Sequence, residues 1–163
     1  GGSFLVLLLD MPPGTGDIAI SVGQLLPHAE VLVVTTPQTA ASDVAGRSGL
    51  VAGQTGQRVI GVVENMAAMT LPDGSVLDLF GSGGGEAVAQ ALSRAGAAAE
   101  STVPLLGSVP LSVGLRRGGD EGVPVVVRDP DDPAARAIDA VADALVRTAG
   151  RRLAGRRLPV TPR

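Results

Sequence analysis

The sequence predicts an α/β fold, a parallel sheet with flanking helices. Three short apolar segments lack polar alternation, as is typical of strands buried on both faces of a sheet. They are Phe4–Leu9, which runs into Asp10, Val31–Thr35 and Arg58–Glu64. Segments with helical spacing of apolar residues separate them, and strands that alternate with helices form βαβ units. With 163 residues and 45% hydrophobic content, the chain can bury the core of one domain.

The remaining elements follow from periodicity and from turn residues. We expect helices over residues 17–26, 39–55, 86–95 and 131–147, a helical turn or two over 111–117, and strands over 104–110 and 123–127. Thr15 or Asp17 is the expected N-cap of the first helix, and Thr39 or Ser42 that of the second. A Pro-Asp-Gly sequence at 72–74 predicts a turn.

One domain is expected over residues 1–149, followed by a basic, disordered tail over residues 150–163. Six of the 13 basic residues lie from Arg147 to Arg163, where there is no acidic residue, so the rest of the chain has an excess of acid. A basic tail could touch nucleic acid or anionic lipid, but this one lacks interleaved aromatic residues. We therefore expect neither a nucleic-acid nor a membrane partner.

Composition excludes several classes of site. No apolar run approaches the roughly 20 residues that span a bilayer, and no secretory signal is recognisable, so a cytoplasmic location is expected. The absence of cysteine excludes disulfides and thiolate metal sites made by this chain alone. All 13 basic residues are arginine, so the lysine-containing phosphate loop GxxxxGK[ST] cannot occur in this sequence.

Asp10 is the leading candidate for chemistry. It ends the first predicted strand, at the edge where open α/β sheets bind ligands, and a Pro-Pro-Gly turn with free backbone amides follows. A carboxylate beside such a turn suits magnesium–nucleotide chemistry, although it could also merely cap the turn. The glycines of residues 81–85, just before a predicted helix, could form an anion-binding nest or a flexible hinge.

The octet DMPPGTGD closely resembles the Walker B and switch II segment of the Mrp/ApbC family, iron–sulfur ATPases of the deviant P-loop group. Five further blocks are similar to those of the family and follow in its order: VTTPQTAASDVAG, GVVENM, FGSGGGE, PLLGSVPL and GGDEGVPVVV. Together they cover about residues 4–127. The resemblance implies a partial P-loop NTPase domain, a Rossmann-like three-layer fold.

The resemblance also implies roles for single residues. Asp10 would hold Mg²⁺ through water, Gly14 would lie near the γ-phosphate, and Asn65 with the Pro110 loop would surround the adenine of ATP. An amide side chain can donate to and accept from a base edge. The structural alternatives are a strand-end cap for Asn65 and a simple turn for Pro110. The resemblance further implies an iron–sulfur cluster as a bound group, apo iron–sulfur proteins as partners, and a homodimer.

Two departures from the family limit what this chain can do. The family's phosphate loop, with two lysines, lies upstream of the segment that matches DMPPGTGD, so we expect this chain alone neither to bind ATP tightly nor to hydrolyse it. Many members also carry Cys-x-x-Cys after the ENM block, where this sequence has Leu71 and Gly74. The expected function is that of an iron–sulfur cluster carrier or assembly ATPase, here as a carboxyl-terminal segment. The alternatives are a MinD/ParA-like positioning ATPase and a catalytically silent fragment.

Overall fold

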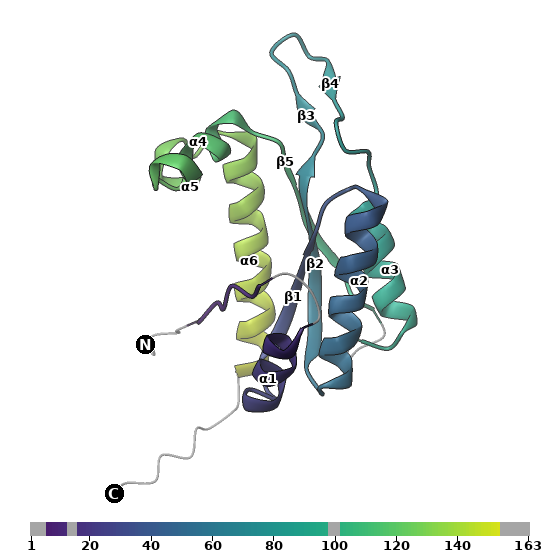
Figure 1. Ribbon diagram of the computed structural model, residues 1–163. Coiled ribbons are helices and arrows are strands. Elements are labelled where there is room, and N and C mark those ends of the chain that lie inside the picture. Colours follow the sequence, from purple (N-terminus) through teal and green to yellow (C-terminus); the bar gives the residue numbers. More distant parts are fainter. Residues whose placement is uncertain (1–5, 13–15, 98–101, 154–163) are drawn as a thin grey trace, which may run out of the picture.

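The computed structural model describes residues 6–12, 16–97 and 102–153. They form three layers, a parallel sheet with helices on each of its faces (Figure 1). The elements follow in the order α1 (Asp17–Leu25), β1 (Glu30–Thr35), α2 (Thr39–Gln54), β2 (Arg58–Ala67), β3 (Met69–Thr70), β4 (Val76–Leu77), α3 (Gly84–Arg94), β5 (Leu105–Pro110), α4 (Val113–Glu121), α5 (Val125–Arg128) and α6 (Pro133–Leu153). Helices α2 and α3 cover one face of the sheet, and α6 covers the other.

The sheet confirms the predicted α/β class. Its strand order is β1-β2-β5, and both neighbouring pairs run parallel. Val33 pairs with Val62 across β1 and β2, and Val62 with Leu105 across β2 and β5. Because all three strands point the same way, their carboxyl ends lie at one edge, the upper one in Figure 1.

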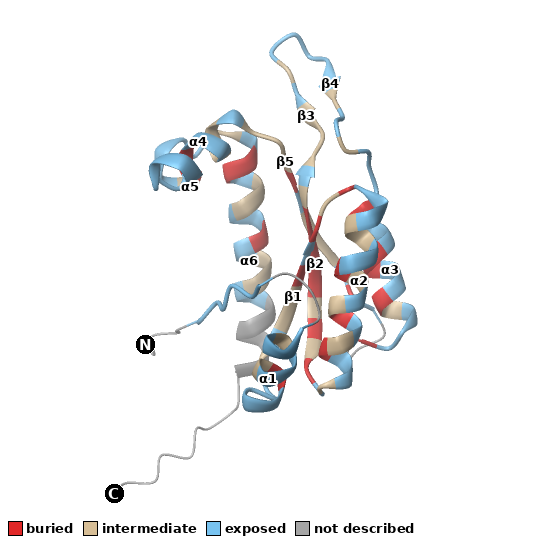
Figure 2. Ribbon diagram, viewed as in Figure 1, coloured by how far each residue is buried: buried red, intermediate tan, exposed pale blue. Residues whose placement is uncertain are grey.

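Two apolar clusters hold the layers together, one on each face of the sheet (Figure 2). The cluster under α2 and α3 contains buried Val33, Ala45, Ala52, Val59, Val62, Val88, Ala89, Leu92, Ala97 and Val103. The cluster under α6 contains buried Val63, Val109, Ala134 and Val141. Since the side chains of Val62 and Val63 point to opposite faces of β2, adjacent valines serve both clusters, which explains why the strand sequence shows no polar alternation.

The predicted first strand is wrong for the part that the structure describes. Residues 6–12 form neither helix nor strand, and Leu7 and Leu8 are 79% and 76% exposed. Phe4 and Leu5 lie outside the described residues. An apolar run becomes a buried strand only when neighbouring strands take up its backbone hydrogen bonds and other layers cover its faces. Within the described residues, the sheet consists of β1, β2 and β5, and Val6–Leu9 pairs with none of them.

Three further differences lie after residue 66. Residues 123–127 were expected as a strand, but Pro124 accepts hydrogen bonds from Val127 and Arg128 and opens the short helix α5. Proline has no amide hydrogen for a strand ladder, and its fixed φ suits a helix start. The connection 67–81 contains the hairpin β3–β4, with the predicted turn at its tip. Helix α6 continues to Leu153 instead of ending near Arg147.

Helices α1 and α2 lack the side-chain caps expected from the sequence. Gly16 is the N-cap of α1 and Gln38 that of α2, and neither makes a capping side-chain hydrogen bond. The Ser42 hydroxyl donates to the Gln38 carbonyl instead. Thr15 lies outside the described residues. Packing against the sheet therefore stabilises α2 more than its cap does.

Candidate functional site

Asn65 and Pro110 lie on neighbouring strands near the carboxyl edge of the sheet. Strands β2 and β5 are neighbours, and Ala67 is the partner of Pro110 in their register. The amide of Leu111 donates to the Ala67 carbonyl at 2.9 Å, which continues the pairing past the end of β5. Both predicted residues are half-buried, so each has a face toward solvent at the edge where open α/β sheets bind ligands.

The backbone at Asn65 has an unusual conformation. Its Oδ1 accepts a hydrogen bond from the Met66 amide at 2.9 Å, as a strand-end cap would. Met66 has a φ of 58°, in the left-handed region, the one described residue other than glycine with a positive φ. Such backbone costs about 1–3 kcal/mol and clusters at functional sites. The Asn65 side-chain nitrogen makes no hydrogen bond with the described residues and is left as a donor.

Glu64, directly before Asn65, is a site residue that the sequence analysis missed. It is 6% exposed, and its Oε2 accepts a hydrogen bond from the Gly85 amide at 2.8 Å, in the first turn of α3. A carboxylate is favourable there because the first amides of a helix lack intrahelical partners. Because Gly85 lies 21 residues further along the chain, no local sequence pattern points to this contact.

Close packing accounts for the glycine run before α3. Gly83 has a φ of 81° and is the N-cap of the helix. A Cβ at Gly84 would lie 2.6 Å from the Thr36 carbonyl oxygen, and one at Gly85 would lie 2.8 Å from Glu64 Cβ. The start of α3 is thus wedged between the ends of β1 and β2. The Glu64 carboxylate takes the place at this helix start that an anion would take in a nest.

Pro110 is held through the loop that follows it. The Ser112 hydroxyl caps α4 by accepting from the Leu115 amide at 3.0 Å, and it donates to Asp132 Oδ2 at 2.6 Å. Asp132 Oδ1 in turn accepts from the Ala134 amide at 2.8 Å, at the start of α6. One pair of side chains therefore ties the end of β5 to two helices.

The other two predicted site residues are not placed at this edge. Asp10 is exposed on a segment outside the sheet, so its carboxylate does not stand at the end of a strand as expected. Gly14 lies outside the described residues. At the same edge, the Thr36 hydroxyl that follows β1 is buried and has no hydrogen-bond partner among the described residues. Buried polar atoms are rarely left without partners, and ordered water commonly supplies one.

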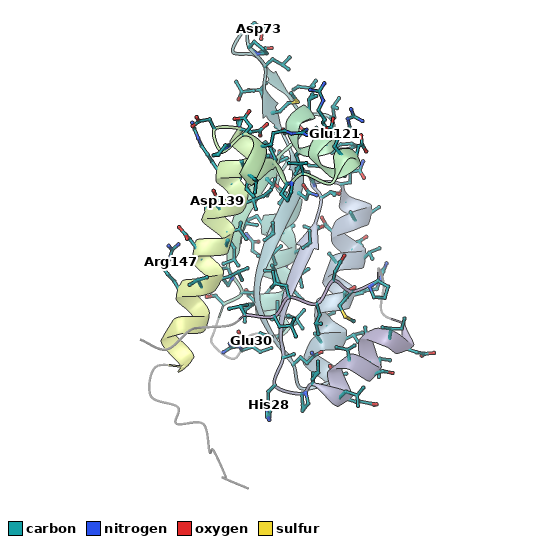
Figure 3. All side chains as sticks on the ribbon, turned by 90° about the vertical axis from the view of Figure 1, so that its left-hand side faces the viewer. His28, Glu30, Asp73, Glu121, Asp139 and Arg147 are labelled. Carbon is teal, nitrogen blue, oxygen red and sulfur yellow. The ribbon has the colours of Figure 1, made fainter. Side chains whose placement is uncertain are left out.

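The β3–β4 hairpin projects beyond the carboxyl edge, and it carries Leu71 and Gly74 at its turn (Figure 1). At the tip, the hydroxyl and the amide of Ser75 donate to the Asp73 carboxylate and hold the pKa of that carboxyl below its usual value (Figure 3). The hairpin offers no thiolate, and no group of three His, Cys, Asp or Glu side chains gathers as a metal site within the described residues.

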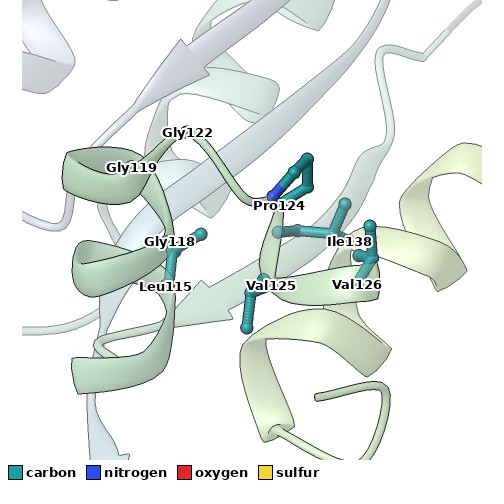
Figure 4. A pocket seen from close by; sticks show the side chains of 8 residues that line it. All are labelled: Leu115, Gly118, Gly119, Gly122, Pro124, Val125, Val126 and Ile138. Carbon is teal, nitrogen blue, oxygen red and sulfur yellow. The ribbon is translucent and has the colours of Figure 1, made fainter. Parts of the chain in front are cut away.

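Two hollows lie beside helices of the described residues. One, of about 380 Å³, is apolar and lies between α4, α5 and α6 (Figure 4). The other, of about 440 Å³, lies between α3 and residues 102–105. Neither is lined by Asp10, Asn65 or Pro110. No described helix is long and apolar enough to cross a membrane.

Comparison with known protein families shows which family this chain belongs to. The family model of the NUBPL iron-transfer P-loop NTPases, of the ParA group, matches residues 2–146. The chain belongs to this family. The resemblance to Mrp/ApbC proteins is thereby confirmed, as is the P-loop NTPase type of the α/β fold.

Curated relatives are iron–sulfur cluster carrier proteins. Those of Mycobacterium tuberculosis and Mycobacterium leprae are 55% and 53% identical over 161 residues, which are 99% of this chain and 41% of each relative. That of Synechocystis is 46% identical over 143 residues, 86% of this chain and 38% of the relative. The chain thus spans less than half the length of the curated relatives it matches.

Solved structures agree with the fold. A nucleotide-binding protein of Archaeoglobus fulgidus, solved with ADP, has a TM-score of 0.53 and 31% identity, covering 69% of this chain and 43% of that chain. The cell division ATPase MinD of Pyrococcus furiosus also has a TM-score of 0.53, at 24% identity, covering 73% of this chain and 43% of that chain. At that identity, MinD supports the fold alone.

Proposed function

We propose that the full-length protein, meaning residues 1–163 with any sequence that precedes or follows them, binds and hydrolyses ATP as an iron–sulfur cluster carrier or assembly factor. The observation that carries this proposal is that Asn65 and Pro110 lie on adjacent strands, near the edge where open α/β sheets bind ligands, in a chain from this family. The family's printed description and the curated relatives supply the cargo.

The described residues suit the base of the nucleotide. The Asn65 side-chain nitrogen can donate to a ring nitrogen of adenine, while its oxygen stays on the Met66 amide. The Pro110 loop, fixed by Ser112, offers an apolar surface beside it. The Thr36 hydroxyl is a second polar group near the same edge.

Asp10 and Gly14 would serve the phosphate end. Leaving the apolar residues Val6–Leu9 in water is unfavourable, and we propose that this segment enters the sheet of the full-length protein. Asp10 would then stand at the carboxyl edge and hold the water shell of Mg²⁺, and the Gly14 amide would face the γ-phosphate. Bound Mg²⁺ supplies charge neutralisation on the phosphates. Neither residue has the positive charge for the phosphates that a phosphate-loop lysine provides.

The cluster is cargo, and this chain does not fit a thiolate site for it. The hairpin turn has Leu71 and Gly74 where the resemblance places cysteines, and the sequence has no cysteine. Thiolate ligands for a cluster must therefore come from residues outside the chain. We further propose apo iron–sulfur proteins as acceptors, a homodimer, a cytoplasmic location, and one domain over residues 1–149 with a basic tail over residues 150–163.

Anaerobic reconstitution with iron and sulfide, together with an ATPase assay, tests the proposal. The full-length protein is expected to gain a stoichiometric cluster, seen as visible absorbance, and to hydrolyse ATP. The 163-residue chain is expected to do neither, because it has no thiolate and no lysine. A full-length protein that hydrolyses ATP but takes up no cluster would contradict the carrier function and favour another client.

A further inference from the structure

The carboxylate of Glu64 stands between two parts of the molecule. It belongs to β2 and is followed directly by Asn65, while its hydrogen bond at 2.8 Å goes to Gly85 in α3. A buried carboxylate is costly unless it is hydrogen-bonded, and a hydrogen bond to a charged acceptor contributes more than a neutral one. The bond therefore ties the end of β2 to the start of α3.

Close packing around the start of α3 restricts movement of the Glu64–Gly85 hydrogen bond. The start of α3 lies against the Thr36 and Pro37 carbonyl oxygens on one side, at 2.6 and 2.7 Å from a Cβ placed on Gly84. On the other side, a Cβ on Gly85 would come within 2.9 Å of Leu105 Cδ1. Helix α3 is thus held in place against β1 and β5. The hydrogen bond from Gly85 to Glu64 then holds the end of β2 in place against α3.

The residues after Glu64 need such support. Met66 stays in the left-handed region at a φ of 58°, and strained backbone of this kind persists only where its surroundings determine it. The Asn65 oxygen is bound to the Met66 amide, so the direction of the Asn65 nitrogen depends on the same turn. Any movement of the β2 end would redirect that nitrogen.

We infer that Glu64 is a positioning residue for nucleotide recognition, which aims the Asn65 amide at the base without touching the nucleotide. This inference rests on the proposed ATP-binding function. Because Glu64 acts at the base end, its loss should weaken binding of ATP and reduce the preference for ATP over GTP. The turnover number should change little, since the phosphate end is served by other residues.

Steady-state kinetics with ATP and GTP on the full-length protein tests the inference. Glu64→Ala is expected to raise KM for ATP about tenfold, with kcat within about twofold, and to lower the ATP-to-GTP preference by a similar factor. Glu64→Gln, whose amide oxygen can still accept from Gly85, should keep KM within about threefold. Glu86→Ala is the matched control, because Glu86 is exposed in the same first turn of α3 and should change nothing.

If Glu64→Ala does not fold, the same measurements are made on Glu64→Asp. This variant keeps the charge, but its side chain is shorter by one methylene, so the carboxylate moves away from Gly85, and the same direction of change in KM and nucleotide preference is expected. Unchanged KM and unchanged nucleotide preference in the folded variant would overturn the inference. A drop in kcat with KM unchanged would overturn it as well, because it would place the effect at the phosphates. If the unchanged protein binds no ATP, the proposed function fails first, and the inference with it.

Discussion

Replacing Leu92 with alanine is expected to lower the free energy of unfolding by about 2–5 kcal/mol. Leu92 is 1% exposed, the least exposed leucine of the cluster beneath α2 and α3. Its methyl groups fill the space over Gly49 of α2, where a Cβ would lie 2.6 Å from Leu92 Cδ2. Truncation leaves a cavity that this close helix pair cannot fill without moving α2. Urea unfolding of the full-length protein, followed by circular dichroism, measures the change.

Leu25→Ala is the matched control for this prediction. Leu25 ends α1 and is 79% exposed, so the same truncation should cost less than about 0.5 kcal/mol. Equal losses from the two variants would mean that Leu92 is not packed between α2 and α3 as the structure has it.

Asp10→Asn is expected to lower kcat for ATP hydrolysis by about 10² or more in the full-length protein. The substitution keeps the shape of the side chain but removes the charge that would hold the water shell of Mg²⁺, and losses of preorganised electrostatic groups have effects of this size. The affinity for ATP should fall much less, because Asn65 and Pro110 serve the base. Phosphate release measures kcat, and calorimetry measures the affinity.

Asp139→Asn provides the control for the loss of charge. Asp139 is an exposed residue of α6, on the outer surface of the molecule (Figure 3), and its substitution should leave kcat unchanged. Hydrolysis by Asp10→Asn within about twofold of the unchanged protein would remove Asp10 from the catalytic residues.

The sequence predicted the sheet well wherever strands are covered on both faces. The bounds of three predicted strands agree with those of observed strands to within about three residues: Val31–Thr35, Arg58–Glu64 and Pro104–Pro110. Short, mainly aliphatic segments are readily buried as strands that other layers cover on both faces. The same pattern failed for Val6–Leu9, the described part of the predicted strand Phe4–Leu9, since apolar character indicates that a segment is favourably buried but does not identify the neighbours that bury it. It also failed at Val123–Val127, where Pro124 outweighed the β-branched residues.

The placement of two candidate site residues could be predicted for a related reason. Asn65 and Pro110 lie near one edge because parallel strands end there, a rule that needs only the strand assignments. Glu64 was missed because its role depends on a contact with Gly85, 21 residues away, which no local pattern reveals. The left-handed backbone of Met66 was equally hidden, since methionine gives no sequence signal for a positive φ.

Calorimetric titration of Mg-ATP into two proteins, the full-length protein and the 163-residue chain, tests most directly whether these residues form one half of a nucleotide site. The full-length protein should bind with a micromolar Kd, and Asn65→Ala should weaken that binding. The 163-residue chain should show no binding in the micromolar range, because it has no lysine for the phosphates. Micromolar binding by the 163-residue chain, or binding by the full-length protein that is indifferent to Asn65, would contradict the proposed site.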